Sequence, residues 1–148
     1  MKQLHTEVLI AARPEAVWAV LTEFARYGDW NPFLVAAAGV PEKGQRLRVT
    51  LAPPGGRRIT MKPVLTEVAN AQVLEWWGHL GVRGIFDGRH RFELHPENGA
   101  TRIVQSETFT GALVPLMARS LDRGTAAGFG QMNTALKARV EQPVERVG

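Results

Sequence analysis

A long helical pattern near the C-terminus, at residues 113–140, constrains the fold of this chain more than any other feature. Apolar or very small residues recur there in steps of three and four, which places them on one stripe of a helix. They are Leu113, Met117, Leu121, Gly124, Gly128, Met132 and Ala135. Such a helix would be roughly 40 Å long at about 1.5 Å per residue. Each glycine within it costs about 1 kcal/mol relative to alanine, so we expect the helix to depend on a surface supplied by the rest of the chain.

The composition indicates a single domain spanning residues 1–148, with an ordered core at about 3–140 and a frayed tail at 142–148. A chain of 148 residues has the usual length of one domain. It contains no cysteine, which excludes disulfides, thiolate metal sites and a cysteine nucleophile. The opening residues lack the apolar segment of a signal peptide, and no apolar run approaches the ~20 residues that cross a bilayer. We therefore expect a soluble cytoplasmic protein without a membrane span.

The formal net charge of +4 raises the question of nucleic-acid binding. The 18 basic residues are scattered, with only short clusters such as Arg57-Arg58 and Arg89-His90-Arg91. The chain has no zinc-finger spacing, no aromatic RNA-binding signature and no basic tail. Because mild basicity spread over a surface is more often a solubility feature, we expect no nucleic-acid partner.

One strand and two short helices are expected before the main sheet. Residues 3–10 alternate loosely and end in an apolar triplet, which is typical of a strand. Pro14 suits the first turn of a following helix, where its missing N–H has no consequence. The aromatic segment at residues 27–33 is expected to be a shaped loop, because Asn31 precedes Pro32 and is biased away from helix.

About six antiparallel strands are expected next. They cover residues 34–40, 46–51, 58–68, 73–80, 84–94 and 101–109. Pro63 inside one of them indicates an edge position or a bulge, and Asn98-Gly99 is typical of a hairpin turn. The expected fold class is α+β, with a curved antiparallel sheet of about seven strands wrapped around the long helix.

Three stretches carry a resemblance to a known superfamily. They are Ile10-Ala11-Ala12-Arg13-Pro14-Glu15-Ala16-Val17-Trp18, then Tyr27-Gly28-Asp29-Trp30-Asn31-Pro32-Phe33, and Gly88-Arg89-His90-Arg91-Phe92-Glu93-Leu94 with Thr101-Arg102 and Glu107-Thr108-Phe109-Thr110-Gly111. The chain resembles the START-like, Bet v 1-like (SRPBCC) superfamily, and within it the bacterial polyketide cyclase/dehydrase-like branch. The resemblance implies the helix-grip fold and a deep apolar cavity between the sheet and the long helix. It brings no invariant catalytic set, so no residue is identified as catalytic by motif.

Period-two alternation assigns side chains to the two faces of the expected sheet. The inward set is Leu74, Trp76, His90, Phe92, Ile103, Gln105, Glu107 and Phe109, and the outward set includes Glu75, Trp77, Arg89, Arg91 and Arg102. His90, Gln105 and Glu107 would need partners, since an unpaired buried polar group costs about 1–3 kcal/mol. His90 and Glu107 are therefore the best candidates for an acid–base or ligand-orienting pair. The alternative is a satisfied pair that only holds neighbouring strands in register.

The expected ligand-binding set adds aromatic and flexible apolar side chains to these polar groups. It consists of Trp30, Phe33, Trp76, His90, Phe92, Gln105, Glu107, Phe109, Met117, Leu121 and Met132. Trp30 and Phe33 belong to it because their loop is expected beside the cavity mouth. Gly124 and Gly128 would bring the helix close to the sheet or introduce a kink that makes room for a ligand. Trp76 has the alternative role of ordinary core.

No metal and no cofactor are expected. The four histidines show no helical pair at i, i+4 and no His-x-His spacing, and thiolate ligands are absent from the composition. Trp77, expected to face outward, would mark either an oligomer contact, such as that of a homodimer, or a merely covered surface.

Three functions remain open from the sequence. The first is binding of a small apolar molecule, lipid-like or aromatic, in the cavity. The second is a polyketide cyclase/aromatase or dehydrase-like lyase that uses His90 and Glu107. The third is a protein-interaction module whose cavity is filled by side chains such as Trp76, Phe92 and Phe109. An open pocket would favour the first two, and a filled one would exclude them.

Overall fold

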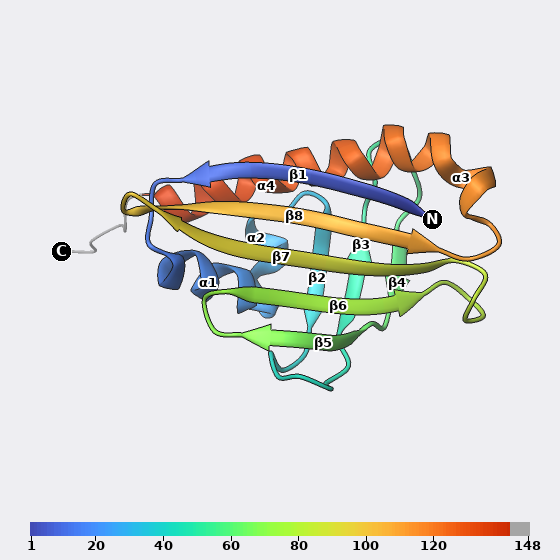
Figure 1. Cartoon of the computed structure of the whole chain (residues 1–148), viewed down its shortest axis with the longest axis horizontal. Coiled ribbons are helices and arrows are strands. Elements are labelled where there is room, and N and C mark those ends of the chain that lie inside the picture. Colours follow the sequence, from blue (N-terminus) through green and yellow to red (C-terminus); the bar gives the residue numbers. More distant parts are fainter. Residues whose placement is uncertain (143–148) are drawn as a thin grey trace.

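The computed structural model describes residues 1–142, so the expected frayed tail lies, apart from Gln142, outside the described residues. Figure 1 shows the long C-terminal helix lying along one face of a large antiparallel sheet, with a second, small sheet behind it. In chain order the elements are β1 (Lys2–Ile10), α1 (Pro14–Thr22), η1 (Phe24–Arg26), α2 (Tyr27–Trp30), β2 (Leu34–Ala38), β3 (Arg48–Leu51), β4 (Ile59–Met61), β5 (Val64–Ala69), β6 (Val73–His79), β7 (Asp87–Glu97), β8 (Ala100–Thr110), α3 (Val114–Ser120), η2 (Leu121–Thr125) and α4 (Ala126–Glu141). This arrangement confirms the predicted α+β fold.

The strands form two sheets rather than the single sheet of about seven strands that was expected. The large sheet has the order β1-β8-β7-β6-β5 and the small one β2-β3-β4. The difference arises at Pro63, which has no N–H to continue a ladder and divides the expected strand 58–68 into β4 and β5. The sheets remain joined through the segment before β3, where the Leu47 N–H donates to the Pro63 carbonyl at 2.7 Å and the Leu65 N–H to the Gln45 carbonyl at 2.8 Å.

The hairpin between β7 and β8 forms at the predicted Asn-Gly turn. Asn98 and Gly99 both have positive φ, of 51° and 82°, which is the combination that a two-residue turn of this kind requires. The turn places His90 directly opposite Glu107, and Phe92 opposite Gln105. The register therefore brings the predicted polar residues together on one face.

The long helix is continuous but not uniformly α-helical. The α-helices α3 and α4 flank a π-helical turn, η2, in which the Ala126 N–H donates to the Leu121 carbonyl. A π turn takes more residues than an α turn, so the buried stripe beyond it shifts relative to the predicted one. Phe129, Asn133 and Leu136 are buried beside the predicted Gly128 and Met132.

The predicted stripe is wrong at its two ends. Leu113 precedes α3 and is 40% exposed, and its neighbour Val114 is buried instead. Ala135, beyond the π turn, is only half-buried, because Leu136 takes the inward position. Within residues 1–142, no helix is both long and apolar enough to cross a membrane.

The concave face of the large sheet carries the predicted inward residues. Leu74, Trp76, His90, Phe92, Ile103, Gln105 and Phe109 are all buried. Under α4 this face packs directly against the helix: Phe129, Met132 and Leu136 have no exposed surface. A β-carbon at Gly128 would overlap the ring of Phe33, so the missing side chain lets the helix approach the small sheet and its preceding loop.

One predicted outward residue, Glu75, is in fact buried, with 8% of its surface exposed. It accepts hydrogen bonds from Arg89 at 2.7 Å and from Arg91 at 2.9 Å, and Thr66 also donates to it. Burial alone would raise the pKa of Glu75, but these hydrogen bonds outweigh it and hold the pKa below its usual value. The arginines thus cover the carboxylate on the outer face.

Trp77, which was expected to mark an oligomer contact or a covered surface, is half-buried. The guanidinium carbon of Arg83 lies 5.1 Å from the centre of its ring. This distance is that of a cation–π contact, so a side chain of the same chain covers part of the ring.

Candidate functional site

A cavity of about 390 Å³ lies beneath the N-terminal part of the long helix. The β6–β7 loop contributes Leu80 and Phe86, and strands β7 and β8 contribute Gly88, Glu107 and Phe109. The β3–β4 region contributes Leu51, Pro53, Pro54, Gly55, Gly56, Arg57, Ile59 and Met61, and the helix contributes Met117, Ser120, Leu121, Arg123, Gly124 and Thr125. The wall is predominantly apolar, with a few polar groups. The volume of the cavity falls in the range of about 300–1,000 Å³ that is typical of small-molecule sites.

The cavity exists because the helix packs on the sheet over only part of its length. Along α4 the buried Phe129, Met132 and Leu136 fill the contact with the sheet, whereas η2 and α3 present Gly124 and Met117 to the cavity. At Gly124 a β-carbon would lie 3.7 Å from Pro53 Cβ, which is ordinary contact distance. The π turn itself forms part of the cavity wall, and single π turns of this kind are frequent at functional sites.

Glu107 is the acidic side chain of the cavity wall. Its Oε2 lies 2.6 Å from Nδ1 of His90, and its side chain is 14% exposed against 2% for His90. Glu107 and His90 also line a small adjoining pocket of about 20 Å³, together with Trp76. Gly88 makes room for the carboxylate, because a β-carbon there would lie 2.6 Å from Oε1 of Glu107. The predicted His–Glu pair is therefore formed, and its carboxylate reaches the cavity.

A chain of hydrogen bonds continues from His90 into the core. His90 Nε2 lies 2.9 Å from Oε1 of Gln105, and Gln105 Nε2 donates to Oδ1 of Asn133 at 2.7 Å. Asn133 Nδ2 donates to Oγ1 of Thr6 at 2.9 Å. The buried polar groups are thus satisfied by one another, across β1, β7, β8 and α4.

Aromatic rings enclose the His90 imidazole. The Trp76 ring stacks on it with centres 5.0 Å apart and planes 21° from parallel, and the Phe129 ring lies 5.0 Å away on α4. Phe92 completes the enclosure at 4.6 Å. These rings fix the plane of the imidazole and keep water from it, so the orientation of the pair toward the cavity is set by packing.

The predicted ligand-binding residues divide into groups by position. Glu107, Phe109, Met117 and Leu121 line the main cavity, and Trp76, His90 and Glu107 line the small pocket. Phe33, Phe92, Gln105 and Met132 instead have no exposed surface and belong to the core. The helix packs flush on the sheet at their level, which is why they contribute no cavity wall.

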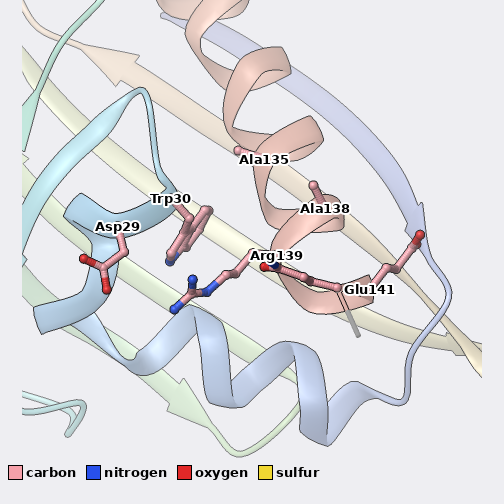
Figure 2. A pocket seen from close by; sticks show the side chains of 7 residues that line it. Asp29, Trp30, Ala135, Ala138, Arg139 and Glu141 are labelled. Atoms are coloured by element: carbon pink, nitrogen blue, oxygen red, sulfur yellow. The ribbon is translucent and has the colours of Figure 1, made fainter. Parts of the chain in front are cut away.

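Trp30 lies at a different place from the one expected, in a groove of about 530 Å³ on the outside of the molecule. Figure 2 shows its ring between α2 and α4, with Arg139 extending toward it. The groove is lined by Asp29, Trp30, Ala135, Ala138, Arg139, Glu141 and Gln142. It lies at least ten residues, or about 15 Å, along the helix from the cavity wall at Thr125. The segment at residues 27–33, which was expected to be a loop and whose first four residues form α2, therefore does not form the cavity mouth.

Sequence reasoning missed two residues of the polar chain, Thr6 and Asn133. Both carried a usable signal. Thr6 shares the inward phase of β1 with the buried Leu4 and Ile10, two and four residues away. Asn133 lies four residues after Phe129 and three before Leu136, so it shares their helix face. A polar residue on a buried face points to a partner.

The loop between β3 and β4 was also missed as a cavity wall. Its Pro53-Pro54-Gly55-Gly56 sequence is typical of a turn, but its proximity to Gly124 of η2 is a tertiary feature that no local pattern encodes. Within residues 1–142, no group of three or more histidine, aspartate or glutamate side chains is placed to hold a metal ion.

Comparison with known proteins agrees with this architecture. A family described as "Polyketide cyclase / dehydrase and lipid transport" matches residues 1–141. Among curated proteins, none matches the sequence. Several solved structures are similar in fold, at sequence identities that establish the fold alone.

Three of these structures illustrate the range. The Zhui aromatase/cyclase from a Streptomyces species is 21% identical, with a TM-score of 0.75, and the match covers 99% of this chain and 98% of that one. A START superfamily protein from Mycobacterium smegmatis is 20% identical, with a TM-score of 0.75 and coverage of 95% and 97%. A Thermus thermophilus protein is 17% identical, with a TM-score of 0.72 and coverage of 94% and 97%.

Proposed function

The chain belongs to the polyketide cyclase/dehydrase and lipid transport family, and from this premise we propose that it binds a small, mainly apolar molecule in the cavity beneath α3 and η2. The observation that carries the proposal is a cavity of about 390 Å³ with a predominantly apolar wall. Leu51, Ile59, Phe86, Phe109 and Leu121 supply much of that wall. Each Å² of apolar ligand surface that leaves water there contributes roughly 25 cal/mol.

The distribution of polar groups supports the same proposal. Arg57, Ser120 and Arg123 border the cavity as exposed residues, whereas Glu107 is largely buried. A few placed polar groups in an otherwise apolar wall are typical of sites that orient a small molecule. The outer groove at Trp30 lacks such a buried polar group among its lining residues, so we place the ligand in the cavity and not in the groove.

Filling the cavity from its helical wall tests the proposal. The variant Gly124→Leu adds a side chain where Gly124 faces the cavity, and a β-carbon fits there without a clash. We expect it to weaken binding of the uncharged fluorescent probe N-phenylnaphthylamine about tenfold or more, measured by titration. The control Gly130→Leu lies on an exposed part of the same helix, where a β-carbon meets nothing within 4 Å. Equal binding by both variants and the parent protein would refute the proposed site.

Material carried by the purified protein provides a second test. Native mass spectrometry of the protein, followed by organic extraction, should release an apolar compound that Gly124→Leu retains less well than Gly130→Leu. Equal retention by the two variants would place the compound outside the cavity and count against the proposal.

A second candidate function is catalysis of a cyclisation or dehydration on a polyketide-like substrate. The observation that favours it is the His90–Glu107 pair at the cavity wall, since such reactions require proton transfer at the bound substrate. The variant Glu107→Gln keeps the size of the side chain but removes its acid–base chemistry. With a substrate in hand, a rate unchanged by this variant would exclude Glu107 from the chemistry.

The third function considered from the sequence, a module with a filled cavity, has less support. Trp76 and Phe92 fill the region beneath α4, but the region beneath α3 and η2 stays open. A homodimer and a cytoplasmic location remain predictions, the first testable by light scattering and the second consistent with a chain that has no cysteine.

A further inference from the structure

The hydrogen bonds that link Thr6, Asn133, Gln105 and His90 run in one donor-to-acceptor direction. A backbone carbonyl group determines that direction. Thr6 Oγ1 lies 3.2 Å from the Gln105 carbonyl oxygen and 2.9 Å from Nδ2 of Asn133. A carbonyl oxygen can only accept, so the single hydroxyl proton of Thr6 is donated to it. The Thr6 oxygen must then accept from Asn133. This requirement orients the Asn133 amide with its NH₂ group toward Thr6.

The orientation of Asn133 propagates to His90. With its NH₂ group turned to Thr6, Asn133 offers Oδ1 to the NH₂ group of Gln105. Gln105 then presents Oε1 to Nε2 of His90, 2.9 Å away, and this nitrogen must carry a proton to donate. Turning both amides round would reverse every bond in the chain and remove the one between Thr6 and the carbonyl. The loss of one hydrogen bond disfavours that state about fivefold.

A proton on Nε2 of His90 limits the protonation forms that the His90–Glu107 pair can adopt. Nδ1 and Oε2 are 2.6 Å apart, a distance at which one of the two must donate. The pair therefore holds one further proton, as imidazolium and carboxylate or as imidazole and carboxylic acid. Both forms have no net charge. In both forms the shared proton lies between Nδ1 of His90 and Oε2 of Glu107, which leaves Oε1 of Glu107 as an acceptor.

Oε1 of Glu107 lies beside Gly88, where a β-carbon would approach it to 2.6 Å, and Glu107 and Gly88 both line the cavity. From this position we infer that Oε1 is the carboxylate oxygen within reach of a ligand. Within residues 1–142, the hydrogen bond of the Glu107 carboxylate to His90 is made by Oε2, which leaves Oε1 for a ligand. Because the pair is neutral, it gives no charge compensation to a cationic ligand, whose burial in an apolar cavity would be costly.

We propose that Thr6, Asn133 and Gln105 are positioning residues that hold His90 with a proton on Nε2, so that the His90–Glu107 pair offers Oε1 to a hydroxyl group of a neutral, mainly apolar ligand. The inference rests on the proposed function for the location of the ligand. The proton arrangement itself is independent of any ligand. The two parts therefore have separate tests.

Nitrogen-15 NMR of the His90 ring tests the proton arrangement. We expect Nε2 to be protonated in the parent protein at neutral pH. The nearly isosteric variant Thr6→Val removes the hydroxyl that sets the direction, and it should shift a measurable share of His90 to the form with a bare Nε2. Thr6→Ser restores the hydroxyl and should restore the parent spectrum. A bare Nε2 in the parent protein, or identical spectra for the Val and Ser variants, would overturn the arrangement.

Affinities for a naphthol and the corresponding methoxynaphthalene test the ligand class. The parent protein should bind the naphthol about tenfold more tightly, since only the hydroxyl can donate to Oε1. Glu107→Met should abolish the preference. Glu107→Gln should still bind the naphthol more tightly than the methoxynaphthalene. The amide of the introduced glutamine donates to the bare Nδ1 of His90 and so turns its oxygen to the cavity. With the reverse arrangement, the same variant would present an NH₂ group, to which both probes can bind.

The outcomes separate the two proposals. Equal affinity of the parent protein for the two probes would overturn hydroxyl recognition but leave ligand binding in place. Failure of both probes to bind would count against the cavity as an apolar site, while the NMR spectra would still decide the proton arrangement. Loss of the preference for the naphthol in both Glu107 variants would support the reverse direction of the hydrogen bonds between Thr6 and His90.

Discussion

The same substitution at neighbouring glycines of the long helix should have opposite effects. Gly128→Ala places a methyl group into the ring of Phe33, which has no exposed surface and packs edge-on against Phe129 with ring centres 5.6 Å apart. Gly130→Ala meets nothing within 4 Å. The helical gain of about 1 kcal/mol from replacing glycine is common to both variants. Overpacking of a tight core costs up to about 3 kcal/mol, and the contact with several ring atoms favours that upper value.

The net expectation is a loss of about 2 kcal/mol in the free energy of unfolding for Gly128→Ala. Gly130→Ala should gain about 1 kcal/mol. Gly124→Ala provides a third point, because a β-carbon there makes ordinary contact at 3.7 Å with Pro53 and faces the cavity. It should not lose stability.

Urea denaturation followed by circular dichroism measures all three variants against the parent. Unchanged slopes of free energy against urea would show that the changes lie in the folded state. If Gly128→Ala is as stable as Gly130→Ala, the helix does not pack flush at Phe33, and the division into a packed part and a cavity part is refuted.

Two further predictions concern residues outside the cavity. The hydrogen bonds that hold the pKa of Glu75 below its usual value mean that its stabilising effect is complete above about pH 4.5 and is lost as the pH falls through the lower folded-state pKa. Glu75→Gln should therefore cost about 2 kcal/mol at pH 7 and less in acid, as measured by urea unfolding across pH. Asn31 Oδ1 accepts from the backbone N–H groups of Phe33 and Leu34 at 3.0 and 2.8 Å, so Asn31→Ala should cost about 2–4 kcal/mol in thermal or urea unfolding. Asn31→Asp retains the acceptors and should cost less, and equal losses would show that these bonds do not matter.

Much of the fold was predictable because it rests on local periodicity. Alternation alone assigned His90, Gln105 and Glu107 to one face, and the Asn98-Gly99 turn determined which of them stand opposite one another. The inward face of the sheet followed from keeping charged residues in water. Where these local signals agree, tertiary structure has little freedom to differ.

The site was less predictable because it depends on the distance between the long helix and the sheet and loop that it faces. Met132 and Met117 both have the spacing of a cavity wall, yet Met132 is fully buried and Met117 lines the cavity. The difference comes from the π turn between them and from the β3–β4 loop that meets it. Neither has a periodic signature, and the same turn displaced the predicted stripe at Ala135. The burial of Glu75 was likewise not predictable from a local pattern, because it depends on arginines from the neighbouring strand.

The two parts of the long helix are connected through the polar chain. Asn133 lies in the packed part, where it is buried on the same helix face as Phe129 and Leu136, and it orients Gln105 and so His90. Glu107, at the other end, belongs to the cavity. A cavity open enough to admit a ligand cannot itself hold a carboxylate in one orientation. The rigid packing beneath α4 does so from behind, through hydrogen bonds whose direction is determined at Thr6. The flush packing that removes half of the helix from the cavity wall is therefore what gives the cavity a defined acceptor, Glu107 of β8.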